Sequence, residues 1–190
     1  MLHFDEQQGG VYYHVISDIP KVKGEHLLLD DRRPNRVYAR VSRQMNAVRD
    51  VYADPKKYER QELPHDLLVA LRELALEKVR KEKYPRYPSR MAALYVSRTF
   101  EEAERWGEFF ARIGRPTYGI AMIRSNGRVF IGDACKCFDG TASEAENLRL
   151  AEKYWENAAD ESEEPPVTEI LVDGDIEILE IIKVIDANIP

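Results

Sequence analysis

Two turn sequences in the C-terminal half limit what this chain can fold into. Asn126-Gly127 lies inside the β-rich stretch "TYGIAMIRSNGRVFIGDACKCF" (117–138), and Asp173-Gly174 lies inside "TEILVDGDIEI". Asn-Gly and Asp-Gly between alternating apolar runs are the strongest short-range signal for a β-hairpin, because its tight turn needs residues that tolerate positive φ. The sequence therefore predicts two antiparallel hairpins.

A long helix is predicted in the middle of the chain. It begins after Pro64 and ends at the proline-rich segment "PRYPSR" (85–90), because proline cannot continue a helix. Lys and Arg collect at its C-terminal end, where the helix dipole favours cations. Its apolar residues recur near helical spacing: Leu67, Leu68, Leu71, Leu74 and Val79.

Two shorter helices are each introduced by a capping-box pattern. Thr99 and Glu102 open the first, for which Gly114 is a C-terminal stop, and Thr141 and Glu144 open the second. Residues 11–18 and 91–97 predict further strands. Since most strands are joined through hairpins, the order favours an α+β fold with antiparallel or mixed sheets. Neither GxGxxG nor GxxxxGK[ST] follows a strand, which leaves out the usual dinucleotide and P-loop signals.

The length of 190 residues suits a single domain, residues 1–190. We divide it into a first strand region (11–25), a largely helical insertion (26–90) and the remainder of the core (91–190). The formal net charge of -6 argues against a broad nucleic-acid footprint. Arg and Lys are nevertheless frequent between Arg32 and Arg90, so a basic face there could meet an anionic ligand.

Targeting signals and cysteines add two expectations. No apolar run reaches the length of a membrane span, and the N-terminus lacks a signal-peptide pattern, so we expect a cytoplasmic protein without a membrane partner. The acidic stretch 156–166 is typical of a solvated loop.

Cys135 and Cys137, two residues apart on a predicted strand, would share a face. Two thiols alone do not make a tetrahedral zinc site, so we expect no metal.

Three predicted strands each carry one polar residue among apolar neighbours. His14 lies in "YYHVI", Tyr95 in "ALYVS" and Glu169 in "TEILV", and alternation puts Ser97 on the face of Tyr95. Each has a structural alternative, namely a hydrogen-bonded core histidine, a core tyrosine with its hydroxyl at the rim, and a solvent-facing glutamate. Periodicity alone does not choose between these and a shared site.

The order of these residues resembles the ADP-ribosyltransferase-like fold of the His–Tyr–Glu type. That family takes a His from the first strand, a Tyr from a later strand that leads into a helix, and a Glu from a strand near the end. A second aromatic residue commonly follows the Tyr at the spacing that Trp106 has here. The stretches "YPSRMAALYVSRTFEEAERWG", "GDACKCF", "AEKYWENA" and "EILVDGDIEI" also resemble a bacterial and phage domain family of undetermined function, over residues 11–185. The segment 26–90 is longer than the usual link in the ADP-ribosyltransferase-like fold.

The resemblance implies a split antiparallel or mixed β-sheet core with flanking helices and a helical insertion. It also implies an enzyme that cleaves the nicotinamide–ribose bond of NAD and transfers ADP-ribose to a protein, a nucleic acid or water. In that chemistry Glu169 stabilises the positive charge on the sugar, and His14 hydrogen-bonds the adenosine-side ribose. Tyr95 stacks on nicotinamide, and Trp106 closes the other side.

The diphosphate of NAD needs donors, and arginine suits phosphate oxygens through bidentate contact. Arg90, just before the strand of Tyr95, is the preferred candidate. A second candidate is the cluster in "DDRRPNR" and beyond, which could equally be a surface loop with internal ion pairs: Arg32, Arg33, Arg36 and Arg40. Ser97 lines the same cleft or caps the following helix.

Two other functions fit the same sequence. The first is a non-catalytic module that keeps the fold and binds a nucleotide or a partner, in which Glu169 is only a surface residue. The second is a phosphotransferase-like relative that acts on 2′-phosphorylated RNA, against which both the acidic net charge and Glu169 count.

Overall fold

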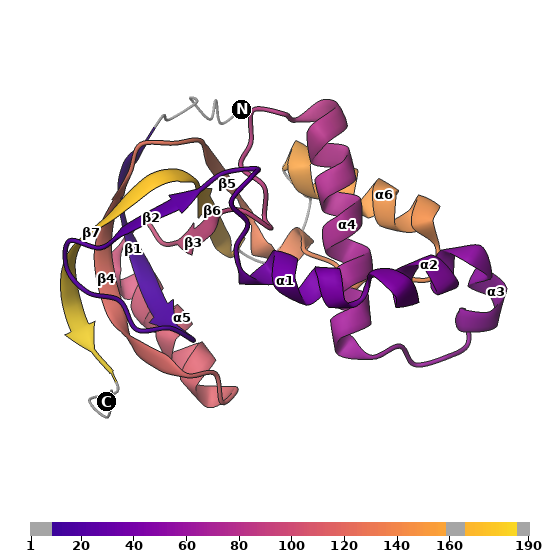
Figure 1. The fold of residues 1–190 in the computed structure, drawn as a ribbon, viewed down its shortest axis with the longest axis horizontal. Helices are drawn as coiled ribbons and strands as arrows, with labels where there is room; N and C mark the ends of the chain where they lie inside the picture. Colours follow the sequence, from indigo (N-terminus) through magenta and orange to yellow (C-terminus); the bar gives the residue numbers. More distant parts are fainter. Residues whose placement is uncertain (1–8, 159–165, 186–190) are drawn as a thin grey trace. The chain divides into compact units, whose positions relative to one another are not determined.

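The computed structural model describes residues 9–158 and 166–185 and combines helices with two antiparallel sheets, which confirms the predicted α+β class (Figure 1). The chain divides into two compact units. The β unit comprises Met1–Asp30, Ala93–Ile131 and Glu169–Pro190, and the helical unit comprises Asp31–Ala92 and Gly132–Thr168.

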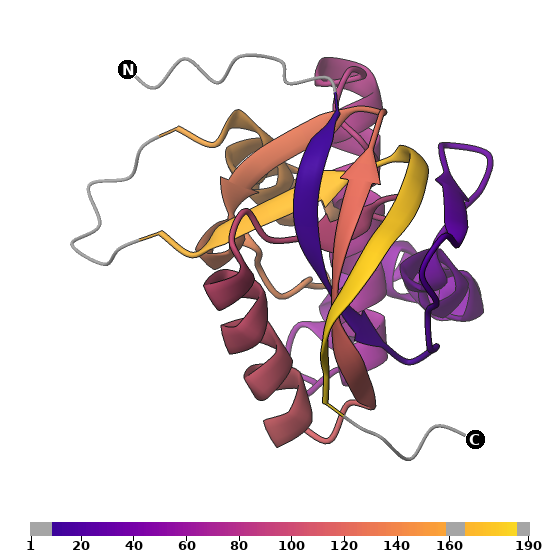
Figure 2. The ribbon, with the colours of Figure 1, turned by 90° about the vertical axis from the view of Figure 1, so that its left-hand side faces the viewer.

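A four-stranded sheet forms the centre of the β unit. Its strands, in spatial order, are β1 (Gly10–Ser17), β4 (Thr117–Ser125), β7 (Gly174–Val184) and β2 (His26–Leu29). All three neighbouring pairs are antiparallel. β1, β4 and β7 run side by side, with helix α5 (Phe100–Arg112) along one face (Figure 2).

A second, three-stranded sheet contains β3 (Leu94–Val96), β6 (Thr168–Val172) and β5 (Val129–Asp133), in that order. Apolar side chains from both sheets share one buried core, which includes Ile16, Ile123 and Ile178 from the first sheet and Val96, Ile170 and Val172 from the second. Burial of these β-branched residues is the main favourable contribution to the stability of this unit.

Neither predicted hairpin forms. The strands on either side of Asn126-Gly127 lie in different sheets, and so do the strands on either side of Asp173-Gly174. The two turns contact each other instead: a Cβ atom on Gly127 would lie 2.3 Å from the carbonyl oxygen of Asp173. Both turns therefore carry the chain from one sheet to the other.

Side chains at these turns satisfy the backbone groups that a hairpin would have paired. The buried carboxylate of Asp173 accepts a hydrogen bond from the Arg128 backbone N–H at 2.6 Å and pairs with the Arg128 guanidinium. The side-chain oxygen of Asn126 accepts one from the Asp175 N–H at 2.9 Å. Turn composition predicted the turns correctly, whereas the pairing of the strands depends on these long-range bonds.

The strand and helix predictions around Tyr95 are confirmed with one change. The capping box of Thr99 and Glu102 opens α5, and Gly114, with φ of +75°, follows its end. The strand predicted over 91–97 covers only Leu94–Val96. A turn precedes the strand, in which the Ser89 carbonyl accepts a hydrogen bond from the Ala92 N–H at 2.9 Å. Because this N–H is used in the turn, it cannot pair with a neighbouring strand, and the strand begins later than predicted.

The helical unit is built around α4 (His65–Lys83), which confirms the long helix predicted after Pro64. Packed with it are α1 (Arg36–Arg43), α2 (Met45–Ala53) and α6 (Glu144–Glu156), and the short α3 (Pro55–Tyr58) contacts α2. Their apolar faces meet in a second core that contains Val41, Val51, Leu67, Leu71 and Met91. This packing holds α1 in place and leaves another face of this helix exposed.

Two local predictions in this unit are wrong. Helix α6 is capped by Ser143, whose Oγ accepts the Glu146 N–H at 3.2 Å, and not by Thr141. The Thr141 hydroxyl is already engaged, since it accepts the Ser143 N–H at 3.2 Å. Cys135 lies in the short 3₁₀ helix η1 (Ala134–Lys136), and Cys137 is its C-cap residue, so the two do not share the face of a strand as predicted.

Three further predictions concern larger segments. The segment 26–90 holds α1–α4, but β2 at its start pairs with β7 in the β unit. The single-domain organisation stays a prediction. Most of the acidic loop predicted over 156–166 falls on residues 159–165, outside the described residues. Among the helices that the structure describes, none has the length and apolar composition needed to cross a membrane.

Candidate functional site

β1 and β3 meet at one point in the β unit. Tyr13 and Ser97 exchange two backbone hydrogen bonds there, with N···O distances of 2.9 and 2.7 Å. Beside this pair, Nδ1 of His14 lies 3.0 Å from the main-chain oxygen of Tyr95. A carbonyl oxygen can only accept, so Nδ1 carries the hydrogen and Nε2 carries the lone pair. The contact therefore fixes both the orientation and the tautomer of the ring.

The half-buried His14 is neutral at pH 7. Burial lowers the pKa of His14 to about 4, although the hydrogen bond to Tyr95 works in the opposite direction. The positive charges of Lys21 and Arg115 lower the pKa further. The ring thus offers an N–H on one side and a hydrogen-bond acceptor on the other.

The strand β6 places Glu169 next to Ser97, the residue that pairs with Tyr13, the neighbour of His14. β3 and β6 are antiparallel with Val96 opposite Ile170, so one further step along this register sets Ser97 beside Glu169. Tyr95 lies two residues before Ser97 and so shares its face. The polar residues predicted from three separate strands therefore lie on adjoining strands of one unit. Ser97 is buried, and Glu169 and Tyr95 are half-buried.

Trp106 lies on the face of α5 that packs against β1. It belongs to a cluster built on Val15, Ala103 and Ile120, and its ring centroid is 5.9 Å from that of Phe110. The indole is half-buried, so part of it is accessible. The predicted nicotinamide sandwich between Trp106 and Tyr95 stays a prediction.

Arg90 belongs to the helical unit and is buried in an ion-pair network. Its Nε donates to Glu73 at 3.0 Å, its Nη1 to the Tyr154 hydroxyl at 2.6 Å, and its Nη2 lies 3.6 Å from the sulfur of Cys137. The side chain of Glu73 is 1% exposed, and Arg72 pairs with it at 3.1 Å. These contacts favour a structural role, and the diphosphate role of Arg90 stays a prediction.

The sequence contains a signal for this network that the prediction missed. Glu73 lies three residues after Ala70 and three before Leu76, on the apolar face of α4. A carboxylate at such a position is buried and needs a cation, because an unpaired buried charge is very costly. The expected partner is an arginine in a neighbouring segment, which is what the structure contains.

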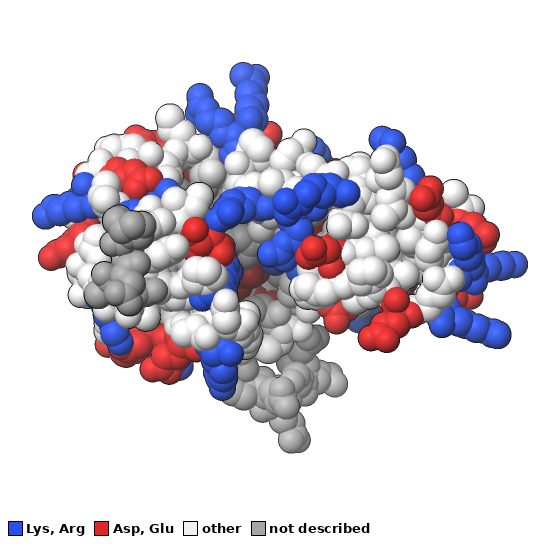
Figure 3. Space-filling view, turned by 60° about the horizontal axis from the view of Figure 1, so that its bottom comes forward, with Lys and Arg blue, Asp and Glu red and all other residues white. Residues whose placement is uncertain are grey.

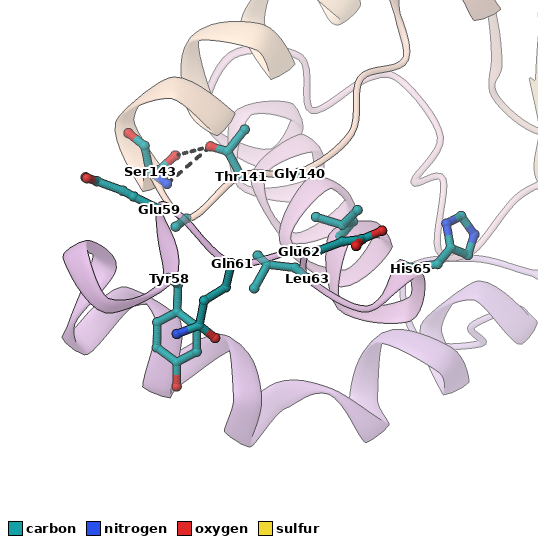
Figure 4. Close-up of a pocket in the computed structure, with 11 residues that line it drawn as sticks. Tyr58, Glu59, Gln61, Glu62, Leu63, His65, Gly140, Thr141 and Ser143 are labelled. Atoms are coloured by element: carbon teal, nitrogen blue, oxygen red, sulfur yellow. Dashed lines mark hydrogen bonds between the residues drawn. The ribbon is translucent and has the colours of Figure 1, made fainter.

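The helical unit also contains an open pocket of about 550 Å³ (Figure 4). The segment from Tyr58 to Leu68 and the segment from Gly140 to Ser143 line it. Thr141 and Ser143 hydrogen-bond each other, while Tyr58 and His65 lie at separate ends. Its charged side chains are exposed, and none of the predicted site residues lines it.

A metal site is not evident in the part of the chain that the structure describes. No group of three or more His, Cys, Asp or Glu side chains there is arranged to hold an ion. Cys135 is exposed, Cys137 is half-buried, and neither forms a disulfide.

Comparison with protein families shows a match over most of the chain. A family model described as "Protein of unknown function (DUF2441)" matches residues 12–184. The matched region runs from before His14 to beyond Glu169 and so includes every predicted site residue. No curated protein matches the chain.

Proposed function

Since the chain belongs to the DUF2441 family, whose function is unknown, we propose from the site itself that the β unit is an NAD-dependent ADP-ribosyltransferase. It would break the nicotinamide–ribose bond and transfer ADP-ribose to an acceptor of protein, nucleic acid or water. The observation that carries this proposal is the 3.0 Å contact between His14 Nδ1 and the Tyr95 carbonyl. That contact ties the first of the three strands to the second.

His14 would act as a binding residue for a ribose hydroxyl. Its Nδ1 hydrogen is committed to Tyr95, so Nε2 is left to accept a hydrogen bond. A neutral imidazole suits this task at pH 7, because a protonated ring has no lone pair for an O–H donor. The low pKa of His14 therefore supports a role as an acceptor.

Glu169 would act on the reacting sugar. When the bond between C1′ and the pyridine nitrogen breaks, its electron pair leaves with the nitrogen, nicotinamide departs neutral and positive charge grows on the ribose. A nearby carboxylate stabilises this charge more in the transition state than in the ground state, which is the condition for catalysis. The acceptor then supplies an electron pair to C1′ and releases a proton.

Tyr95 and Trp106 would hold the nicotinamide ring, and Ser97 would line the site beside Glu169. The backbone of Tyr95 is fixed by the ladder with β6 and by the contact with His14, which favours a preorganised position. Arg90 is left out of the proposed site, because its N–H groups already bind Glu73 and Tyr154.

A non-catalytic nucleotide- or partner-binding module is the second candidate. One observation favours it, namely the packing of the Trp106 ring against Phe109 and Phe110 within its own helix, which limits its freedom to close on a ligand. In this candidate the half-buried Glu169 has no role in bond cleavage.

Calorimetry with NAD, ADP-ribose and nicotinamide separates the two candidates when it is combined with an assay for nicotinamide release. The enzyme requires NAD binding and turnover, with turnover lost in Glu169→Gln. The module requires binding without turnover that Glu169→Gln leaves unchanged. Absence of both binding and turnover with protein, nucleic-acid and water acceptors would reject both.

A further inference from the structure

The segment 32–49 is an unusual concentration of arginine. It contains no Lys, Asp or Glu, although the whole chain has 34 acidic residues against 28 basic ones. Its six arginines are all exposed: Arg32, Arg33, Arg36, Arg40, Arg43 and Arg49. A strongly positive surface therefore exists on a chain with a net charge of -6.

Helix α1 arranges three of these arginines in a row. Arg36, Arg40 and Arg43 follow the i, i+4, i+7 spacing and so share one face of the helix. A different face, with Val37 and Val41, packs into the core of the helical unit. In the space-filling view, Lys and Arg gather over the part of the surface where α1 lies (Figure 3). We call these three residues the arginine face.

The start of α1 is fixed in place, so the arginine face is presented by a rigid element. The side-chain oxygen of Asn35 accepts the Val37 N–H at 2.8 Å, and its side-chain nitrogen donates to the Arg90 carbonyl at 2.8 Å. The backbone N–H of Asn35 also donates to the Met91 carbonyl at 2.9 Å. Such an N-cap stabilises the first turn of a helix.

The positive charge of the arginine face is little compensated within the chain. Arg36 and Arg43 form no ion pair with any residue in the described ranges 9–158 and 166–185. Arg40 approaches Asp66 at 3.9 Å, and both side chains are about half exposed to solvent, so this pair contributes little. An external anion therefore does not have to displace a strong internal partner.

We propose that the arginine face binds the phosphate backbone of a nucleic acid. Guanidinium groups bind phosphate oxygens in a bidentate manner, and the exclusive use of Arg over Lys suits this geometry. Arg36 and Arg43 are about 10 Å apart along the helix axis, which allows contact with more than one phosphate of the same polyanion. The arginine face therefore suits a polymer with regularly spaced phosphates better than a ligand with a single phosphate.

The surroundings of the arginine face argue for contact with the backbone. The exposed Tyr38 lies on another side of α1 by helical periodicity, so it cannot stack a base held against the arginines. No apolar residue of α1 shares the arginine face, which disfavours insertion into a lipid surface. The contact should thus be largely independent of base sequence and strongly dependent on salt. This inference does not depend on the proposed NAD chemistry.

The test measures fluorescence anisotropy of a labelled single-stranded RNA and of a labelled DNA duplex, over a range of salt concentrations. The variant Arg36→Gln, Arg40→Gln, Arg43→Gln removes the arginine face and keeps good helix-forming residues. The matched control is Arg60→Gln, Arg105→Gln, Arg112→Gln, which removes three exposed arginines outside the segment. Circular dichroism verifies that both variants are folded.

The wild type should bind at low salt and lose affinity as salt increases. The arginine-face variant should bind at least about tenfold more weakly and lower the slope of log K against log salt by up to about three, whereas the control should change much less. The proposal is overturned if the wild type binds neither probe, or if both variants weaken binding equally. It is also overturned if polyglutamate or anionic vesicles compete as well as the nucleic acids.

Discussion

Nδ1 of His14 lies 3.0 Å from the main-chain oxygen of Tyr95, across two strands that are far apart in the sequence. The contact orients the imidazole without involving the tyrosine side chain. Because Nδ1 is used for this contact, Nε2 is the ring nitrogen that can accept a hydrogen bond from a ligand. The proposed NAD site, and the pH dependence of the fold, both rest on this arrangement.

The stability of the chain should fall in acid because His14 must take up a proton. The pKa of His14 is about 4 in the folded chain and 6.5 as its ordinary value, so between these values the unfolded chain binds more protons. The contribution of neutral His14 to the free energy of unfolding is complete above pH 6.5 and is lost as the pH falls towards 4. The loss is at most about 3 kcal/mol for this half-buried ring.

Urea unfolding between pH 7 and pH 4 measures this effect, with His14→Asn as the control. The asparagine amide can donate to the Tyr95 carbonyl as Nδ1 does, but it does not titrate. The wild type should therefore lose more stability in acid than the variant. Equal losses would show that His14 does not contribute.

Removal of Glu73 should destabilise the helical unit more than removal of Arg90. Glu73 pairs with both Arg90 and Arg72, so Glu73→Leu leaves two guanidinium groups without their carboxylate, one of them buried. Breaking a buried pair costs about 3–5 kcal/mol. Arg90→Met leaves Glu73 paired with Arg72 and should cost less.

A double-mutant cycle by chemical denaturation checks this prediction. The double variant Glu73→Leu, Arg90→Met should lose less stability than the sum of the single variants, because it leaves neither charge of the pair unmatched. Additive losses would mean that the two side chains are not coupled.

The crossing between the two sheets should be highly sensitive to a methyl group at Gly174. This residue has φ of +85°, and an added Cβ would lie 2.8 Å from the backbone of Gly127. Gly24 is the matched control, since it has φ of +81° but no atom within 4 Å of an added Cβ.

Gly24→Ala should therefore cost only the left-handed strain of about 1–2 kcal/mol, and Gly174→Ala should cost clearly more. Thermal unfolding of both variants compares them directly. Similar losses would indicate that the two turns do not pack tightly against each other.

Nicotinamide binding should alter the fluorescence of Trp106. The chain has two tryptophans, and Trp155 is buried in the helical unit with its Nε1 bonded to the Leu76 carbonyl. NAD should therefore quench the emission of the wild type through ring stacking, and Trp106→Phe should abolish the quenching. Quenching that persists in Trp106→Phe would place the ligand elsewhere.

Local patterns predicted the helices and the turns well. The capping box at Thr99 and the apolar periodicity after Pro64 act over a few residues, so the sequence reports them directly. The predicted pairing of the strands was wrong. The Asp173 carboxylate accepts a hydrogen bond from the backbone N–H of Arg128, and no local sequence pattern indicates this long-range contact.

The site shows the same limit. Alternation identified His14, Tyr95 and Glu169 as polar residues on apolar strands, and the family resemblance suggested that they belong together. Neither alternation nor the resemblance could reveal that His14 contacts the backbone carbonyl of Tyr95. The chemistry of Arg90 was predicted from its residue type, whereas its partners depend on the burial of Glu73, which the fold determines.

The most direct test of the proposed function is the release of nicotinamide from NAD by purified protein, measured by chromatography. The wild type should release nicotinamide, Glu169→Gln should lose this activity, and Glu180→Gln, which alters an exposed carboxylate of β7, should retain it. Turnover that persists unchanged in Glu169→Gln would contradict the account.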